Sequence, residues 1–177
     1  MAEYCISKEE LERAFDERFP AEIKEKLNNA SVAVAGLGGL GSNIAVMLAR
    51  SGVGRLFLVD FDRVDVTNIN RQAYFISHIG MEKTTALRQI LEQINPYMSI
   101  ETKTVKVTED NAPELFGSYP IVCEAFDRPD QKAMLTGTLL SSCPALPWSQ
   151  VMEWLVTGMP MIYGQKRKCA GFMSAEI

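Results

Sequence analysis

Four closely spaced glycines have the arrangement of a phosphate-binding turn. Gly36, Gly38 and Gly41 satisfy the pattern G-x-G-x-x-G, and Gly39 lies between them. The apolar run 32–35 predicts a strand before the glycines, and a helix-like apolar pattern follows them. In this order the first glycine allows a tight turn, the second lets the backbone approach a phosphate, and the third lets the helix pack on the strand. Free N–H groups at the start of the helix then favour a bound anion.

A second group of polar side chains follows the next predicted strand. Asp60 lies about twenty residues after the glycines, where a carboxylate can bind a ribose hydroxyl. Up to this point, an NAD-dependent dehydrogenase and an ATP-dependent enzyme look alike. The group continues with Asn68, Arg71, Gln72 and Lys83. A hydride-transfer site needs an apolar slot for nicotinamide, whereas fixed cations stabilise charge on a triphosphate and its leaving pyrophosphate, so this group favours ATP.

Strand-like and helix-like segments alternate along the chain and must position these side chains. The expected helices are 7–19, 20–27, 44–52, 82–94, 110–116 and 128–142, and the expected strands are 32–35, 56–59, 100–107 and 119–125. The alternation predicts an α/β fold, Rossmann-like and doubly wound, with a mostly parallel sheet and helices on both faces. The polar, irregular stretch 61–80 is long enough to favour a functional loop.

Composition narrows the possible partners and compartments. The net charge of −4 argues against nucleic acid as the main partner. We find no signal-peptide pattern and no apolar run of membrane-spanning length, so we expect a cytoplasmic protein without membrane contact. The four cysteines form no C-x-x-C pair, which disfavours zinc. We expect Cys123 to be buried and inert in a strand, we assign Cys143 no role because no motif supports it, and we expect His78 to be a loop or helix-start residue rather than a catalyst.

Several of these stretches together resemble the ThiF family. The resemblance rests on residues 35–43, 60–72 and 124–127 and on Lys83, and it covers about residues 7–147. ThiF proteins are adenylyltransferases, related to ubiquitin-activating enzymes, that activate small sulfur-carrier proteins. The chain is most similar to the short type without a zinc segment, in agreement with the missing C-x-x-C pairs.

The resemblance implies a role for each polar residue. Gly36, Gly38, Gly39 and Gly41 would line the nucleotide pocket, Asp60 would hold the ribose with Asp62 nearby, Asn68, Arg71, Gln72 and Lys83 would hold the phosphates, and Asp127 would hold Mg²⁺. The glycine carboxylate of a ThiS-like carrier would attack ATP and release pyrophosphate, most often for thiamine synthesis. This nucleophile is already ionised at neutral pH, so no general base is needed. The family also implies a homodimer in which Arg13 or Arg18 reaches the neighbouring subunit.

The sequence after Pro147 no longer follows the pattern of the ThiF family. The expected domains are therefore a helical segment 1–30, a nucleotide-binding domain 31–147 and an atypical segment 148–177. The family would have a further strand and a glycine-rich turn here, so we expect the C-terminal strands to be missing. One hypothesis is a frameshift near Pro147, because a codon choice exists that restores a family-like peptide, and the gene sequence would test it. The alternative is a genuine, divergent helix at 150–156 followed by a basic turn.

Three functions remain compatible with the sequence. The first is an active adenylyltransferase for a carrier protein. The second is a truncated nucleotide-binding protein without turnover, because a lost strand would expose a sheet edge and apolar surface. The third is an NAD-dependent oxidoreductase.

Overall fold

The strands of the described part of the chain form one parallel sheet in the order β3-β2-β1-β4. The structure is a computed structural model that describes residues 6–142. In chain order the elements are α1 (Lys8–Asp16), α2 (Ala21–Asn29), β1 (Ser31–Ala35), α3 (Gly39–Arg50), β2 (Arg55–Asp60), the 3-10 turns η1 (Val66–Asn68) and η2 (Ile76–His78), α4 (Lys83–Ile94), β3 (Ser99–Thr104), α5 (Ala112–Phe116), β4 (Ile121–Glu124) and α6 (Pro129–Ser142).

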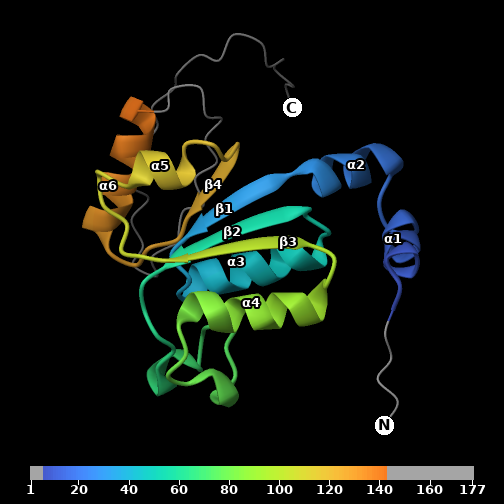
Figure 1. Ribbon diagram of the computed structural model, residues 1–177, viewed down its shortest axis with the longest axis horizontal. Helices are drawn as coiled ribbons and strands as arrows, with labels where there is room; N and C mark the ends of the chain where they lie inside the picture. The colour runs from blue at the N-terminus through green and yellow to red at the C-terminus, as the bar shows by residue number, and fades with distance from the viewer. Residues whose placement is uncertain (1–5, 143–177) are drawn as a thin grey trace, which may run out of the picture.

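The central strands β1 and β2 are apolar over nearly their whole length because both faces of the sheet are covered. Helices α3 and α4 lie on one face, and α5 and α6 lie on the other (Figure 1). Val34 and Leu58 contribute to the core under α3 and α4, whereas Ala35 and Val59 face the core that contains Phe116. The predicted doubly wound α/β fold is therefore confirmed, and every strand pair in the described part is parallel.

The strand order reverses direction between β1 and β4. From β1 the chain adds β2 and then β3 on one side, and afterwards returns to add β4 on the other side. Connections leaving β1 and β4 therefore diverge at the carboxyl ends of these strands. In open parallel sheets this position forms the crevice in which ligands bind.

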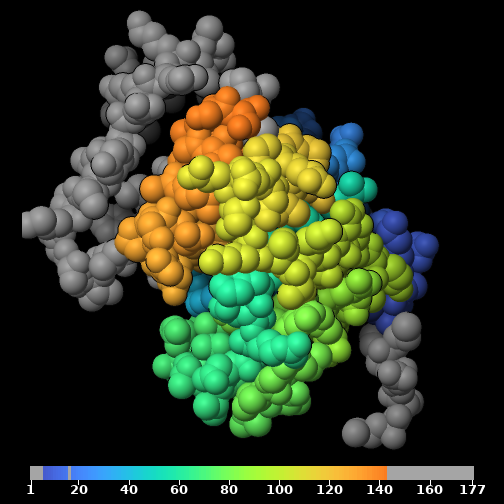
Figure 2. Space-filling model, turned by 60° about the vertical axis from the view of Figure 1, so that its left-hand side comes forward, coloured from blue at the N-terminus to red at the C-terminus, as the bar shows by residue number. Residues whose placement is uncertain are grey.

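The connection from β2 to α4 is the long polar stretch that the sequence singled out. It contains η1 and η2 and forms a lobe, coloured green, at the lower side of the molecule in Figure 2. Its ends are held together, because the N–H of Val64 donates to the carbonyl of Met81 at 2.8 Å and Arg63 donates to the carbonyl of Gly80 at 2.8 Å. The lobe is thus an ordered turn structure above the site.

Some predicted boundaries are wrong by a few residues. Helix α3 begins at Gly39 rather than Ile44, because the Ser42 N–H already donates to the Gly38 carbonyl and this backbone bond needs no apolar side chain. Helix α1 begins at Lys8, one residue after the predicted start, but ends at Asp16, short of residue 19. Strands β3 and β4 are shorter than 100–107 and 119–125. The segment 148–177, with the expected missing strands, the frameshift hypothesis and the last domain boundary, lies outside the described residues.

Replacing Gly54 with alanine is expected to lower the free energy of unfolding by about 1–3 kcal/mol. A Cβ atom at Gly54 would overlap the carbonyl oxygen of Asn28, so α2 could not keep its place before β2. The matched variant Gly137→Ala lies within α6 where a Cβ meets nothing within 4 Å, and it should gain up to about 1 kcal/mol because alanine is the better helix former. Urea unfolding followed by circular dichroism measures both values. Equal stability of Gly54→Ala and the wild type would contradict the close approach of α2.

Candidate functional site

The glycine turn joins β1 directly to the amino end of α3. Gly36 has φ +91°, and a Cβ there would lie 2.9 Å from the Phe126 ring and 3.0 Å from the Ala125 carbonyl oxygen. A Cβ at Gly41 would overlap the carbonyl of Gly36, so the helix can begin this close to the strand only with glycine there. At Gly38 nothing lies within 4 Å of an added Cβ. The turn therefore leaves open space in front of the first N–H groups of α3.

Asp60 joins the loop after β1 to the loop after β2. Its Oδ2 accepts from the Leu37 N–H at 2.6 Å, and its Oδ1 accepts from the Asp62 N–H at 2.8 Å. The carbonyl of Leu37 accepts from the buried Tyr74 hydroxyl at 2.8 Å, so both polar groups of Leu37 are held. Each oxygen of Asp60 keeps capacity for a further hydrogen bond. The predicted ribose ligand is thus also the residue that fixes the glycine turn.

Lys83 lies at the start of α4 and forms an ion pair with Asp62. Lys83 Nζ is 2.8 Å from Asp62 Oδ2, and the Lys83 N–H donates to the Asp62 carbonyl at 3.0 Å. The Lys83 side chain is 7% exposed, whereas that of Asp62 is 48% exposed. A buried ammonium needs a partner of opposite charge, and Asp62 supplies it from the adjacent loop.

Arg71 lies over the glycine turn. Its Cγ would be 3.5 Å from a Cβ built on Gly39, and its Nη1 donates to the carbonyl of Thr67 at 2.9 Å. The guanidinium is exposed and keeps further N–H donors free for an anion. Asn68 belongs to the same turn, where its Oδ1 accepts from the Asp65 N–H at 3.0 Å. The lobe therefore brings the Arg71 cation over the glycine turn, whereas this contact of Asn68 lies within the lobe itself.

Gln72 is buried next to Arg71 and is 8% exposed. Its Oε1 has no hydrogen-bond partner among the described residues. A buried acceptor without a partner costs roughly 1–3 kcal/mol. Because this oxygen can only accept, a donor and not a phosphate oxygen would be needed to complete its hydrogen bonding.

Asp127 follows β4 on the other side of the crevice. The Ala125 N–H donates to the Ala35 carbonyl at 2.9 Å, which continues the β1–β4 pairing, and Phe126 contacts Gly36 as described above. Asp127 comes one residue later and is exposed. Among residues 6–142 no group of three or more acidic, histidine or cysteine side chains could hold a metal. A single exposed carboxylate such as Asp127 could hold Mg²⁺ only together with oxygen ligands from a bound molecule or from water.

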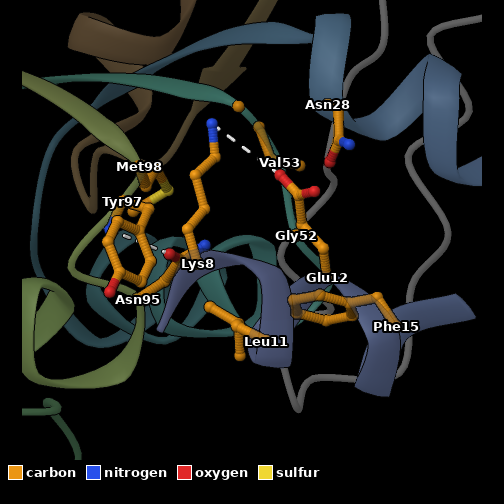
Figure 3. A pocket seen from close by; sticks show the side chains of 11 residues that line it. Lys8, Leu11, Glu12, Phe15, Asn28, Gly52, Val53, Asn95, Tyr97 and Met98 are labelled. Carbon is orange, nitrogen blue, oxygen red and sulfur yellow. Dashed lines mark hydrogen bonds and ion pairs between the residues drawn. The ribbon is translucent and has the colours of Figure 1, made fainter. Parts of the chain in front are cut away.

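Two predicted residues are not part of this edge. Arg13 lies in α1 and Arg18 follows it, and α1 lies by the amino-terminal ends of the strands (Figure 1). A groove of about 210 Å³ separates α1 from the segments that precede β2 and β3; Phe15, Gly52 and Tyr97 are among its lining residues (Figure 3). Both arginines therefore belong to the opposite edge from the glycine turn of the same chain.

Three contacts at the site escaped the sequence analysis. Tyr74 bonds Leu37, Ser42 accepts a hydrogen bond from Ala73, and Asn43 donates to Arg71. Ser42 and Asn43 could have been noticed as polar residues in the first turn of a helix that starts at glycines. Tyr74 gave no such signal, because an aromatic residue in a loop is equally compatible with simple packing.

The remaining predicted residues have structural roles. Cys123 is buried as expected, and burial raises the pKa of its thiol, which makes it a poor nucleophile. His78 closes η2, where its Nδ1 accepts from the Phe75 N–H at 3.1 Å. Cys143 lies outside the described residues.

No helix in the described range has the length and apolar character needed to cross a membrane.

Comparison with known proteins identifies the family. Residues 11–174 match the model of the ThiF family. The match includes most of segment 148–177, so it gives no support to the expected departure from the family in that segment.

The chain is also similar to individual relatives. It is 41% identical over 103 residues to the adenylyltransferase and sulfurtransferase MOCS3 of Anopheles gambiae, covering 58% of this chain and 23% of that protein. It is 36% identical over 126 residues to the sulfur carrier protein adenylyltransferase of Thermus thermophilus, covering 68% of this chain and 46% of that protein. Among solved structures it is similar to the E. coli tRNA N6-threonylcarbamoyladenosine dehydratase TcdA in complex with ATP, with a TM-score of 0.74, 29% identity, and coverage of 83% of this chain and 61% of that chain. The chain thus spans less than half the length of these two sequence relatives.

Replacing Tyr74 with phenylalanine is expected to reduce the loss of stability at alkaline pH. Burial and the charges of Asp60 and Asp62 raise the pKa of Tyr74 above its ordinary value of 10.0. The folded state therefore keeps this proton where the unfolded state releases it, so stability is full below about pH 10 and falls above it. Urea unfolding between pH 8 and about 11 measures the effect. The pKa values of Tyr119 and Cys123 are also raised, but both residues remain in the variant and in the wild type, so their contributions cancel in the comparison. An identical pH dependence of variant and wild type would therefore contradict the assignment to Tyr74.

Proposed function

Because the chain belongs to the ThiF family, we propose that it binds ATP at the carboxyl edge of its sheet and transfers AMP to a carboxylate of a small carrier protein. One observation carries the proposal. The glycine turn follows β1 with an exposed arginine over it, a buried lysine ion pair follows the adjacent strand β2, and an exposed aspartate follows β4 on the other side of β1. Dehydrogenases share the glycine turn, but the added cations match the chemistry of a triphosphate.

Different residues would bind different parts of the nucleotide. The turn at Gly36, Gly38, Gly39 and Gly41 would face the nucleotide through backbone N–H groups, and Asp60 with Asp62 would bind the ribose. Asn68, Arg71, Gln72 and Lys83 would bind the phosphates. Support comes from the open space at Gly38 and from the fixed positions of Arg71 and Lys83 over the adjoining loops.

The proposed reaction needs positioning more than proton transfer. A carboxylate oxygen at the carrier's C-terminus attacks the α-phosphorus of ATP and forms a new O–P bond. The bond from the α-phosphorus to the bridging oxygen breaks, and pyrophosphate leaves with the electron pair. Cations held in place before the reaction stabilise the charge on pyrophosphate without reorganisation, which is consistent with a site that offers Arg71 and Lys83 but no catalytic histidine.

Asp127 is the residue that would hold Mg²⁺. The ion neutralises phosphate charge and orients the leaving group when it is bound. The protein's part is to present one exposed carboxylate across from the glycine turn, as Asp127 does after β4.

The carrier and the assembly form the finer part of the proposal. We take the carrier to be a ThiS-like protein with a C-terminal glycine, with thiamine synthesis as the expected pathway. The name of the Thermus relative, a sulfur carrier protein adenylyltransferase, supports a small sulfur carrier as the partner but names neither the carrier nor the pathway. We also propose a homodimer in which Arg13 or Arg18 serves the partner's site. Their position at the edge opposite the glycine turn of their own chain is compatible with such an exchange.

Replacing Arg71 with alanine is expected to lower ATP–pyrophosphate exchange by about 100-fold, because the phosphates lose a fixed cation. The exchange is measured with a small carrier protein that ends in Gly-Gly. Arg88→Ala is the matched control, because Arg88 is exposed on α4 and pairs only with Glu92 among the described residues. Full exchange by Arg71→Ala would remove this residue from the site. ATP binding without any exchange by the wild type would instead indicate a nucleotide-binding protein without turnover, and binding of NADH but not ATP would contradict the proposal.

Replacing Asp127 with asparagine is expected to raise the Mg²⁺ concentration for half-maximal exchange by about tenfold, because the ion loses its carboxylate ligand. Asp130→Asn is the control, since Asp130 is an exposed aspartate of α6 paired with Arg128. The measurement is exchange against Mg²⁺ concentration at constant ATP. A similar Mg²⁺ dependence in both variants would contradict a metal-binding role for Asp127.

A further inference from the structure

We propose that Ser42 and Asn43 are positioning residues that fix the Arg71 turn over the amino end of α3. This inference rests on the proposed function, since it explains how Arg71 is held where phosphates would bind. Both residues are in the first turn of α3, and both contact backbone groups of residues 71–73, roughly thirty positions later in the chain.

Ser42 joins the two segments through its hydroxyl. Its Oγ donates to the carbonyl of Gly38 at 2.6 Å and accepts from the N–H of Ala73 at 3.1 Å. The side chain is fully buried. The first bond is the ordinary contact of a helical serine with the preceding turn. The second is different, because it ties a loop amide to the turn that would bind phosphate.

Asn43 makes the second link. Its Nδ2 donates to the carbonyl of Gly39 at 2.6 Å and to the carbonyl of Arg71 at 3.0 Å. Both protons of one amide nitrogen are thereby used, one on each segment. With its backbone carbonyl held by Asn43, Arg71 extends its side chain over Gly39. Its Cγ would lie 3.5 Å from a Cβ built on Gly39.

The two links lie on either side of Gln72. With Arg71 held by Asn43 and Ala73 held by Ser42, the backbone between them has little freedom, and the Gln72 side chain is buried. Other contacts of the Arg71 guanidinium, to Thr67 and Asn70, lie within the lobe itself. Besides the bond from the Tyr74 hydroxyl to the Leu37 carbonyl, the links from α3 connect the Arg71 turn with the glycine turn.

Amide hydrogen exchange tests the anchoring without any ligand. In Ser42→Ala the Ala73 amide should exchange about tenfold faster, because it loses its buried acceptor. Ser51→Ala is the matched control: Ser51 makes the same bond to the preceding turn, to the Met47 carbonyl at 2.9 Å, and no contact with the lobe. Unchanged exchange at Ala73 in Ser42→Ala would overturn the proposal.

ATP affinity, measured by calorimetry, tests the consequence for Arg71. Asn43→Ala should weaken ATP binding about tenfold and adenosine binding less than about twofold, because only ATP carries the charged groups that Arg71 meets. In an Arg71→Ala background, Asn43→Ala should have little further effect on ATP. Asn29→Ala, an exposed asparagine at the end of α2, is the control for loss of an amide.

The outcomes separate this inference from the proposed function. Equal weakening of ATP and adenosine, or effects of Asn43→Ala and Arg71→Ala that multiply, would overturn the positioning role. No binding of ATP by a folded wild-type chain would overturn the proposed function and, with it, the phosphate-directed part of this inference. Faster exchange at Ala73 in Ser42→Ala would still support the anchoring of the turn in that case.

Discussion

The carboxylate of Asp60 is the interaction on which the arrangement at the carboxyl edge depends. It accepts from the backbone N–H of Leu37 in the loop after β1 and from that of Asp62 in the loop after β2. A carboxylate that accepts backbone N–H bonds in a buried position makes stronger bonds than a neutral acceptor would. Since the two strands are neighbours, one side chain of β2 fixes both loops. Tyr74 completes the arrangement from the lobe by bonding the carbonyl of Leu37.

The same carboxylate links the neutral and charged parts of the site. Asp62 receives its backbone position from Asp60 and then holds the ammonium of Lys83. The Lys83 side chain is 7% exposed and its Nζ lies 2.8 Å from Asp62 Oδ2, so the position of this cation depends on the loop that Asp60 orders. Electrostatic stabilisation of a reaction requires charges that are already in place, and this chain of contacts supplies that condition.

The glycines also help to shape the site, because they let the backbones of the turn, of α3 and of the end of β4 approach one another closely. A Cβ at Gly41 would overlap the Gly36 carbonyl, and a Cβ at Gly36 would press against Phe126 and Ala125. The turn therefore lies tightly between α3 and the end of β4, and only its outer side at Gly38 stays open. The lobe after β2 covers this region from the opposite direction, with the Arg71 turn linked to α3. The glycine turn and the Arg71 turn are thus fixed relative to each other by hydrogen bonds.

The sequence alone determined the fold class, the glycine turn and the types of the site residues, because these depend on local patterns. Apolar runs such as 32–35, which ends at glycines, specify a buried parallel strand and a tight turn whatever the remote contacts are. The first turn of α3 was missed, since its helix begins through backbone bonds that have no apolar signature. Only the tertiary structure decided that Asp60 bonds inward to Leu37, that Lys83 pairs with Asp62 and that Ser42 and Asn43 hold the Arg71 turn. These contacts join residues that are about twenty to thirty positions apart, and such pairings follow from how strands and loops meet in space rather than from any local pattern.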